Sequence, residues 1–170
     1  MARDPAEALT TAPVTPPVMP LAPGDPAPPV TAATQTGERI TVDFEAPAVL
    51  FFYPADATPG CTTEATQFDR ELETYLDAGV AVYGVSTDDV DSHASFADEE
   101  DLDVTLLADP DATVAEAFEV DVEEGRAART TFVCAGGQVC GLYEGVRPDG
   151  HARNVLMDML EEGLVSLDED

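Results

Sequence analysis

The chain has 170 residues, of which 35 are acidic and 7 are basic, so its formal net charge is −28. A chain of this length is most simply one domain that buries its own core, and a hydrophobic content of 44% excludes a chain that is disordered for want of apolar surface. An acidic surface repels phosphate backbones and anionic lipids, and no run of 18 apolar residues exists, so we expect no nucleic-acid and no membrane partner.

The acidity belongs to the folded part of the chain and not to a tail. Residues 1–29 carry a net charge of only −2, and the remaining residues carry −26. All seven cations are Arg, and Lys is absent. Such a composition resembles proteins of salt-accumulating halophiles, in which molar salt shortens the Debye length to about 3 Å and screens self-repulsion. An ordinary acidic protein is the alternative.

Regular elements are predicted from residue 30 onward. Nine of the 14 prolines lie in residues 1–29, which we expect to be extended, with a disordered tail over residues 1–20 before a domain over residues 21–170. Strands are predicted at 47–53, 80–85, 104–108, 129–134 and 139–144. Helices are predicted at 61–77, 89–101, 111–118 and 149–162. This alternation indicates an α/β fold with a mixed central sheet flanked by helices.

The helices are predicted to bury apolar faces, and the last two strands to form a hairpin. The inward residues expected are Ala65, Phe68, Leu72 and Leu76 in the first helix, and Val90, Ala94 and Ala97 in the second. The hairpin turns at Gly136 and Gly137. His93 and His151 are expected at helix ends or on the surface, and no metal site is predicted.

Cys61 occupies the most informative position in the chain. It follows a buried strand and begins a helix, and the partial positive charge of a helix N-terminus favours a thiolate there. Thr58 can direct its hydroxyl at the sulfur or at a bound oxygen atom, and Gly60 permits a close approach of the backbone. Pro54 and Pro59 stiffen the loop. The pattern indicates a nucleophilic cysteine, although a free Cys is also often a buried small hydrophobic residue.

The chain resembles the peroxiredoxins, and most closely the PrxQ or bacterioferritin-comigratory-protein branch, over residues 21 to about 160. The matching segments are 51–54 (FFYP), 58–62 (TPGCT), 92–96 (SHASF), 109–111 (DPD) and 129–133 (RTTFV). The resemblance implies a thioredoxin-like fold, no cofactor, a monomer or weak dimer, and reduction of hydrogen peroxide and organic hydroperoxides. Electrons would come from thioredoxin or from a low-molecular-weight thiol.

The resemblance also assigns roles to individual residues. Cys61 would be the nucleophile and become a sulfenic acid, while Thr58 and Arg129 hold the peroxide. Pro54 would shield the pocket, and Glu64 would orient the guanidinium of Arg129.

The chain departs from the family at the resolving cysteine. The position five residues after Cys61 is Thr66, and the helix at 89–101 has no Cys. Cys134 and Cys140 remain, at the hairpin end away from Arg129, and five residues of strand span roughly 16 Å. If the hairpin loop has three residues, the two cysteines lie opposite each other and can form their own disulfide. If the loop has the two residues Gly136 and Gly137, the cysteines lie on opposite faces of the hairpin.

We therefore expect a one-Cys mechanism in which an external thiol reduces the sulfenic acid. We also expect a cytoplasmic protein, because the cysteines are few and the N-terminus lacks the pattern of a secretory signal peptide. Resolution by Cys134 or Cys140, within or between chains, is an alternative. A redox sensor or holdase without efficient turnover, and a non-catalytic thioredoxin-fold binding module, are the rival functions.

Overall fold

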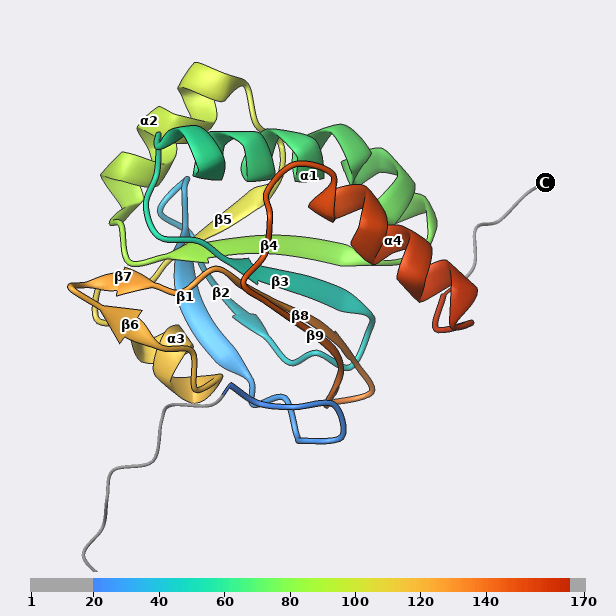
Figure 1. Cartoon of the computed structure of the whole chain (residues 1–170). Helices are drawn as coiled ribbons and strands as arrows, with labels where there is room; N and C mark the ends of the chain where they lie inside the picture. Colours follow the sequence, from blue (N-terminus) through green and yellow to red (C-terminus); the bar gives the residue numbers. More distant parts are fainter. Residues whose placement is uncertain (1–19, 166–170) are drawn as a thin grey trace, which may run out of the picture.

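The computed structural model describes residues 20–165, which form a seven-stranded mixed sheet covered by helices on both faces (Figure 1). The strands are β1 (Val30–Thr34), β2 (Arg39–Val42), β3 (Ala48–Phe52), β4 (Ala81–Ser86), β5 (Thr105–Ala108), β6 (Val122–Glu123), β7 (Arg126–Ala127), β8 (Thr130–Ala135) and β9 (Gln138–Glu144). The helices are α1 (Pro59–Asp77), α2 (Val90–Glu100), α3 (Thr113–Ala117) and α4 (His151–Glu161). None of these helices is long and apolar enough to cross a membrane.

The strand order in the sheet is β2-β1-β5-β4-β3-β8-β9, while β6 and β7 pair separately. β3, β4 and β5 run parallel, and the other neighbours in the large sheet are antiparallel. β3 lies inside the sheet with every residue buried, which explains its continuous apolar sequence. One face packs against α1, α2 and α4, and the other packs against α3 (Figure 1).

The structure confirms the predicted mixed sheet and adds elements that the sequence pattern did not indicate. Every predicted strand and helix is present within a few residues. β1 and β2 were missed, because they are short and carry exposed polar residues, β2 at the edge of the sheet and β1 beside it. The segment 20–29, expected to be extended, pairs with the hairpin loop: the Gly24 amide donates to the Val139 carbonyl (2.8 Å) and the Ala27 amide to the Gly137 carbonyl (2.9 Å). The rest of the predicted tail lies outside the described residues.

Two predicted helix faces are wrong in detail. In α1, Leu76 is 57% exposed and Tyr75 is buried instead, with its hydroxyl donating to the Ala152 carbonyl at 2.5 Å. In α2, the buried residues are His93 and Phe96, whereas Val90 and Ala97 are half-buried and Ala94 is exposed. The aromatic ring of Phe96 fills the interface that three small residues were expected to fill.

Candidate active site

Cys61 lies where the chain leaves β3 and enters α1. Pro59 is the first residue of the helix, and Thr58 is its N-cap with an extended backbone (φ −81°, ψ 154°). Proline is well suited to that first position because its missing N–H would have no partner within the helix. Cys61 therefore lies in the first turn, close to the unpaired amide groups of the helix N-terminus, and is only 1% exposed.

Arg129 reaches Cys61 because β8 pairs with β3. The register sets Thr130 opposite Phe52, so the residue before β8 lies beside the end of β3, where α1 begins. The Nη2 group of Arg129 donates to the Cys61 Sγ at 3.3 Å. The Nη1 group of the same guanidinium donates to the Glu64 Oε1 at 2.6 Å. One cation thus contacts both the thiol and a carboxylate.

Glu64 is a buried acid on the same face of α1 as Cys61. It is 0% exposed, and its Oε2 has no hydrogen-bond partner among the described residues. Burial raises the pKa of Glu64 to about 7, and the charge and hydrogen bond of Arg129 act in the opposite direction. The guanidinium is therefore fixed by a group that is itself close to changing its protonation state at neutral pH.

The loop residues around Cys61 leave room for the guanidinium. A Cβ on Gly60 would approach the Arg129 Nη2 to 3.3 Å and the Pro148 Cγ to 3.5 Å, so glycine permits this packing. Thr58 directs its hydroxyl to the Ala55 carbonyl at 3.1 Å and not to the sulfur. Pro54 is the second residue after β3 and is half-buried.

Cys134 and Cys140 lie far from this site and on opposite faces of the sheet. The hairpin turns through two residues, and a bulge after Val133 leaves Cys140 without an opposite residue while Cys134 pairs with Val139. Cys134 is fully buried towards α3, whereas Cys140 packs partly against the α1 and α4 side. Burial, with a smaller contribution from Cys140, raises the pKa of Cys134 to about 12. All three cysteines are free thiols.

Residues 149–151, at the start of α4, contact α1 and β8, and sequence reasoning did not indicate these contacts. His151 lies at a helix end, as one of the two predicted alternatives had it, because it is the first residue of α4; it is not on the surface, being 6% exposed with its Nε2 2.8 Å from the Thr131 Oγ1. Burial and the charge of Arg129 lower the pKa of His151 to about 4, so its ring is neutral at physiological pH. Gln67 on α1 hydrogen-bonds to Asp149 (2.8 Å) and to the Gly150 amide (2.7 Å), which ties this segment to the helix.

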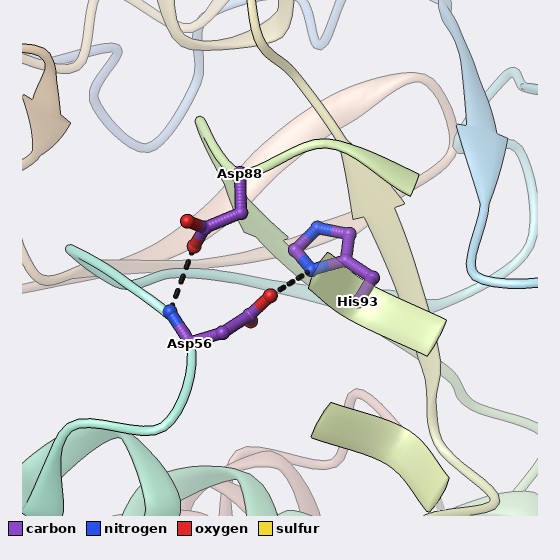
Figure 2. Close-up of side chains that lie close together, drawn as sticks. All are labelled: Asp56, Asp88 and His93. Atoms are coloured by element: carbon purple, nitrogen blue, oxygen red, sulfur yellow. Dashed lines mark hydrogen bonds and ion pairs between the residues drawn. The ribbon is translucent and has the colours of Figure 1, made fainter. Parts of the chain in front are cut away.

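A second polar cluster adjoins the loop between β3 and α1. Figure 2 shows the backbone amide of Asp56 donating to Asp88 and its carboxylate contacting His93. His93 is 0% exposed, so its expected place on the surface is wrong. Asp56, Asp88 and His93 have the chemistry of metal ligands and lie within 4.8 Å of one another. The carboxylate oxygens and the His93 Nδ1 that face one another already form hydrogen bonds, so the cluster is a hydrogen-bond network.

Comparison with known proteins agrees with this geometry. The profile of the AhpC/TSA family matches residues 23–139. The chain is 38% identical over 143 residues to a putative peroxiredoxin bcp of Coxiella burnetii, covering 78% of this chain and 95% of that protein. It is 33% identical over 153 residues to peroxiredoxin Bcp of Escherichia coli K12, covering 84% and 97%. The crystal structure of peroxidoxin BcpB from Mycobacterium tuberculosis superposes with a TM-score of 0.77 at 33% identity, over 83% of this chain and 97% of that one.

Proposed function

The chain belongs to the AhpC/TSA family and is a thioredoxin-fold peroxiredoxin of the Bcp/PrxQ branch, and from this premise we propose that Cys61 carries its thiol-dependent peroxidase reaction. One observation carries the proposal: the guanidinium of Arg129 donates simultaneously to the Cys61 sulfur and to Glu64, at the N-terminus of α1. A cation and a helix N-terminus both favour the thiolate, which is the attacking form.

The reaction breaks the O–O bond of the peroxide. The Cys61 thiolate attacks the terminal oxygen, the S–O bond of a sulfenic acid forms, and the leaving oxygen takes a proton and departs as water or an alcohol. The sulfur is oxidised and the peroxide reduced by two electrons. Arg129 supplies donors towards the charge that moves onto the leaving oxygen. We assign Thr58 the second donor to the peroxide, after its hydroxyl leaves the Ala55 carbonyl, and Pro54 the cover of the pocket.

We further propose that an external thiol, thioredoxin or a small molecule, reduces the sulfenic acid. The position that would hold a nearby resolving cysteine is Thr66, whose hydroxyl donates to the Thr62 carbonyl at 2.7 Å. Cys134 pairs with Ala48 at the beginning of β3, whereas Cys61 follows the end of that strand. Two thiol groups of the reductant then reduce the sulfenic acid: the first releases water and forms a mixed disulfide with Cys61, and the second displaces Cys61 as the thiolate and leaves the reductant as a disulfide. We expect the chain to act as a monomer or weak dimer.

Peroxide consumption with added thiol reductants tests this mechanism. Wild-type protein and the Cys140→Ser control should turn over many times, and Cys61→Ser should be inactive. Mass spectrometry after one equivalent of peroxide should find Cys61 as sulfenic acid or its trapped adduct. A Cys61 link to Cys134 or Cys140 would contradict the one-Cys mechanism, and arrest after one equivalent with every reductant would favour a redox sensor. An unmodified Cys61 would refute the whole scheme.

We propose a halophilic, cytoplasmic setting for this reaction. The net charge of −28, the absence of Lys and the exposed acids along α2 support a surface adapted to molar salt, and three free thiols suit a reducing compartment. Salt should then raise the rate at which Cys61 reacts with peroxide, because it screens an acidic field that opposes the thiolate. A rate that stays flat from low to molar salt in folded protein would contradict this proposal.

A further inference from the structure

The loop between β3 and α1 is held by the carboxylate of Asp56, which receives three hydrogen bonds. The Tyr53 hydroxyl donates to Oδ1 at 2.7 Å, and the Ser92 hydroxyl and His93 Nδ1 contact Oδ2 at 2.7 Å each. The backbone amide of Asp56 donates to Asp88 at 2.7 Å (Figure 2). The loop that leads to the nucleophile is thereby tied to its own first residue, Tyr53, to the segment after β4 and to α2.

The hydrogen bonds also define where the protons lie. The Nδ1 of His93 faces the Asp56 carboxylate, and its Nε2 faces the Leu107 carbonyl oxygen at 3.0 Å. A neutral imidazole has one N–H, so only the imidazolium form can donate to both of these oxygen atoms. Burial alone would raise the pKa of Asp56, but the hydrogen bond and charge of His93 and the Tyr53 hydroxyl hold it below its ordinary value. Asp56 is therefore the ionised partner.

This ion pair is almost completely removed from water. The side chains of His93 and Asp56 are 0% and 4% exposed. The titratable groups that face the pair are Tyr53, which directly follows β3, and Asp88 from the segment after β4. Burial and the nearby Asp56 charge raise the pKa of Tyr53 well above its ordinary value, so its hydroxyl remains a donor. A buried carboxylate is tolerated only with such partners.

The loop needs an external anchor because its own backbone is unfavourable. Ala57 has a φ of 65°, in the left-handed region that residues with a Cβ rarely adopt. Ala57 lies between Asp56 and Thr58, so the network at Asp56 fixes the residue before the strained position and the helix fixes the residues after it. The placement of Thr58 and of the first turn of α1 follows from both constraints.

We propose that Asp56 and His93 are positioning residues for the peroxidase reaction: their buried ion pair fixes the loop before Cys61, and the imidazolium cancels a carboxylate charge that would oppose the thiolate. This inference rests on the proposed role of Cys61. It adds two residues that neither contact the sulfur nor supply donors to the peroxide. His93 acts through Asp56, and Asp56 acts through the loop.

Two single variants and their combination separate the two contributions. His93→Gln leaves the carboxylate without its cation, and should lower the rate constant with hydrogen peroxide about tenfold and raise the pH of half-maximal Cys61 reactivity by about one unit. Asp56→Asn removes the carboxylate charge, and His93 then loses the second proton of its ring. The rate constant should therefore fall several-fold, while the pH of half-maximal Cys61 reactivity stays unchanged. The double variant should restore the wild-type midpoint but not the rate. Glu99→Gln, an exposed acid on the same helix, is the matched control.

If the pair had only a structural role, the variants would react more slowly but the pH of half-maximal Cys61 reactivity would not rise in His93→Gln and return in the double variant. The same pH of half-maximal reactivity in these two variants would therefore overturn the proposal. Folding of each variant is checked by circular dichroism at molar salt. Nitrogen-15 NMR of the wild-type protein at pH 7 needs no variant: both His93 nitrogens should carry protons, and a neutral ring would also overturn the proposal. Peroxidase activity that survives Cys61→Ser would instead refute the proposed function, which the NMR measurement does not address.

Discussion

Arg129→Lys tests whether the reaction needs the forked shape of the guanidinium or only its positive charge. The two Nη atoms contact different groups, the Cys61 Sγ at 3.3 Å and the Glu64 Oε1 at 2.6 Å. A lysine ammonium is one point charge, and the shorter contact to a buried carboxylate should retain it. The sulfur and the peroxide then lose one hydrogen bond to a charged donor, worth about 1.5–3 kcal/mol. Since 1.36 kcal/mol is a factor of ten, the rate constant should fall about 10- to 100-fold.

Stopped-flow measurement of Cys61 oxidation by hydrogen peroxide at molar salt provides the assay. Arg153→Lys is the matched control, because the Arg153 side chain is 73% exposed and lies 3.8 Å from Glu71, and its rate should equal that of wild type. Circular dichroism verifies that both variants fold. If Arg129→Lys reacts within threefold of wild type, charge alone is sufficient, and the argument from two separate donors is wrong.

Three further predictions concern stability and thiol chemistry. Burial raises the pKa of Glu64 from 4.5 to about 7, so the free energy of unfolding should fall by roughly 3 kcal/mol as the pH rises across that interval. Urea unfolding at several pH values should show this fall in the wild-type protein and not in Glu64→Gln. The same pH dependence in both proteins would contradict the prediction. Gln67→Ala should lower the free energy of unfolding by about 1–2 kcal/mol through two lost hydrogen bonds, against no change for the exposed Glu73→Ala. At pH 8, iodoacetamide should modify Cys140 and spare Cys134, whose pKa is raised to about 12 by burial, as peptide mass spectrometry would detect.

The fold was predictable wherever local pattern and tertiary environment agree. β3 is apolar throughout because both of its faces are covered, and the hairpin turns at Gly136 and Gly137, whose φ values of 61° and 75° suit a two-residue loop. The edge strand β2 and its neighbour β1 were missed although their burial alternates, because Thr and Arg interrupt the apolar signal. In α1 the last buried position is Tyr75, because its hydroxyl has an acceptor on α4 that no local pattern indicates.

Within the candidate site, the place of Cys61 at the start of a helix was predictable from the sequence, and the family resemblance indicated the contact of Glu64 with Arg129, but the buried histidines were not predictable. Cys61 is marked by its neighbours in sequence: a buried strand before it, and Pro59 and Gly60 at the start of a helix. His93 carries no such mark. A histidine can be buried there only because two acceptors reach it, Asp56 from a loop 37 residues earlier and the carbonyl of Leu107 from β5. These partners are brought together by the sheet order, which the sequence pattern left undefined.

The two buried ion pairs near Cys61 also bear on what the net charge does. Each cation at the site contacts its own acidic side chain, Arg129 with Glu64 and His93 with Asp56, so the two pairs together add at most one positive charge, set by the protonation of Glu64, although the chain carries −28. Surface charges are screened beyond about 3 Å in molar salt, while buried pairs are screened far less. The salt response of Cys61 therefore reports the acidic surface, and the variants of Arg129 and His93, compared at one salt concentration, report the buried pairs. The two electrostatic contributions can be measured separately on the same thiol.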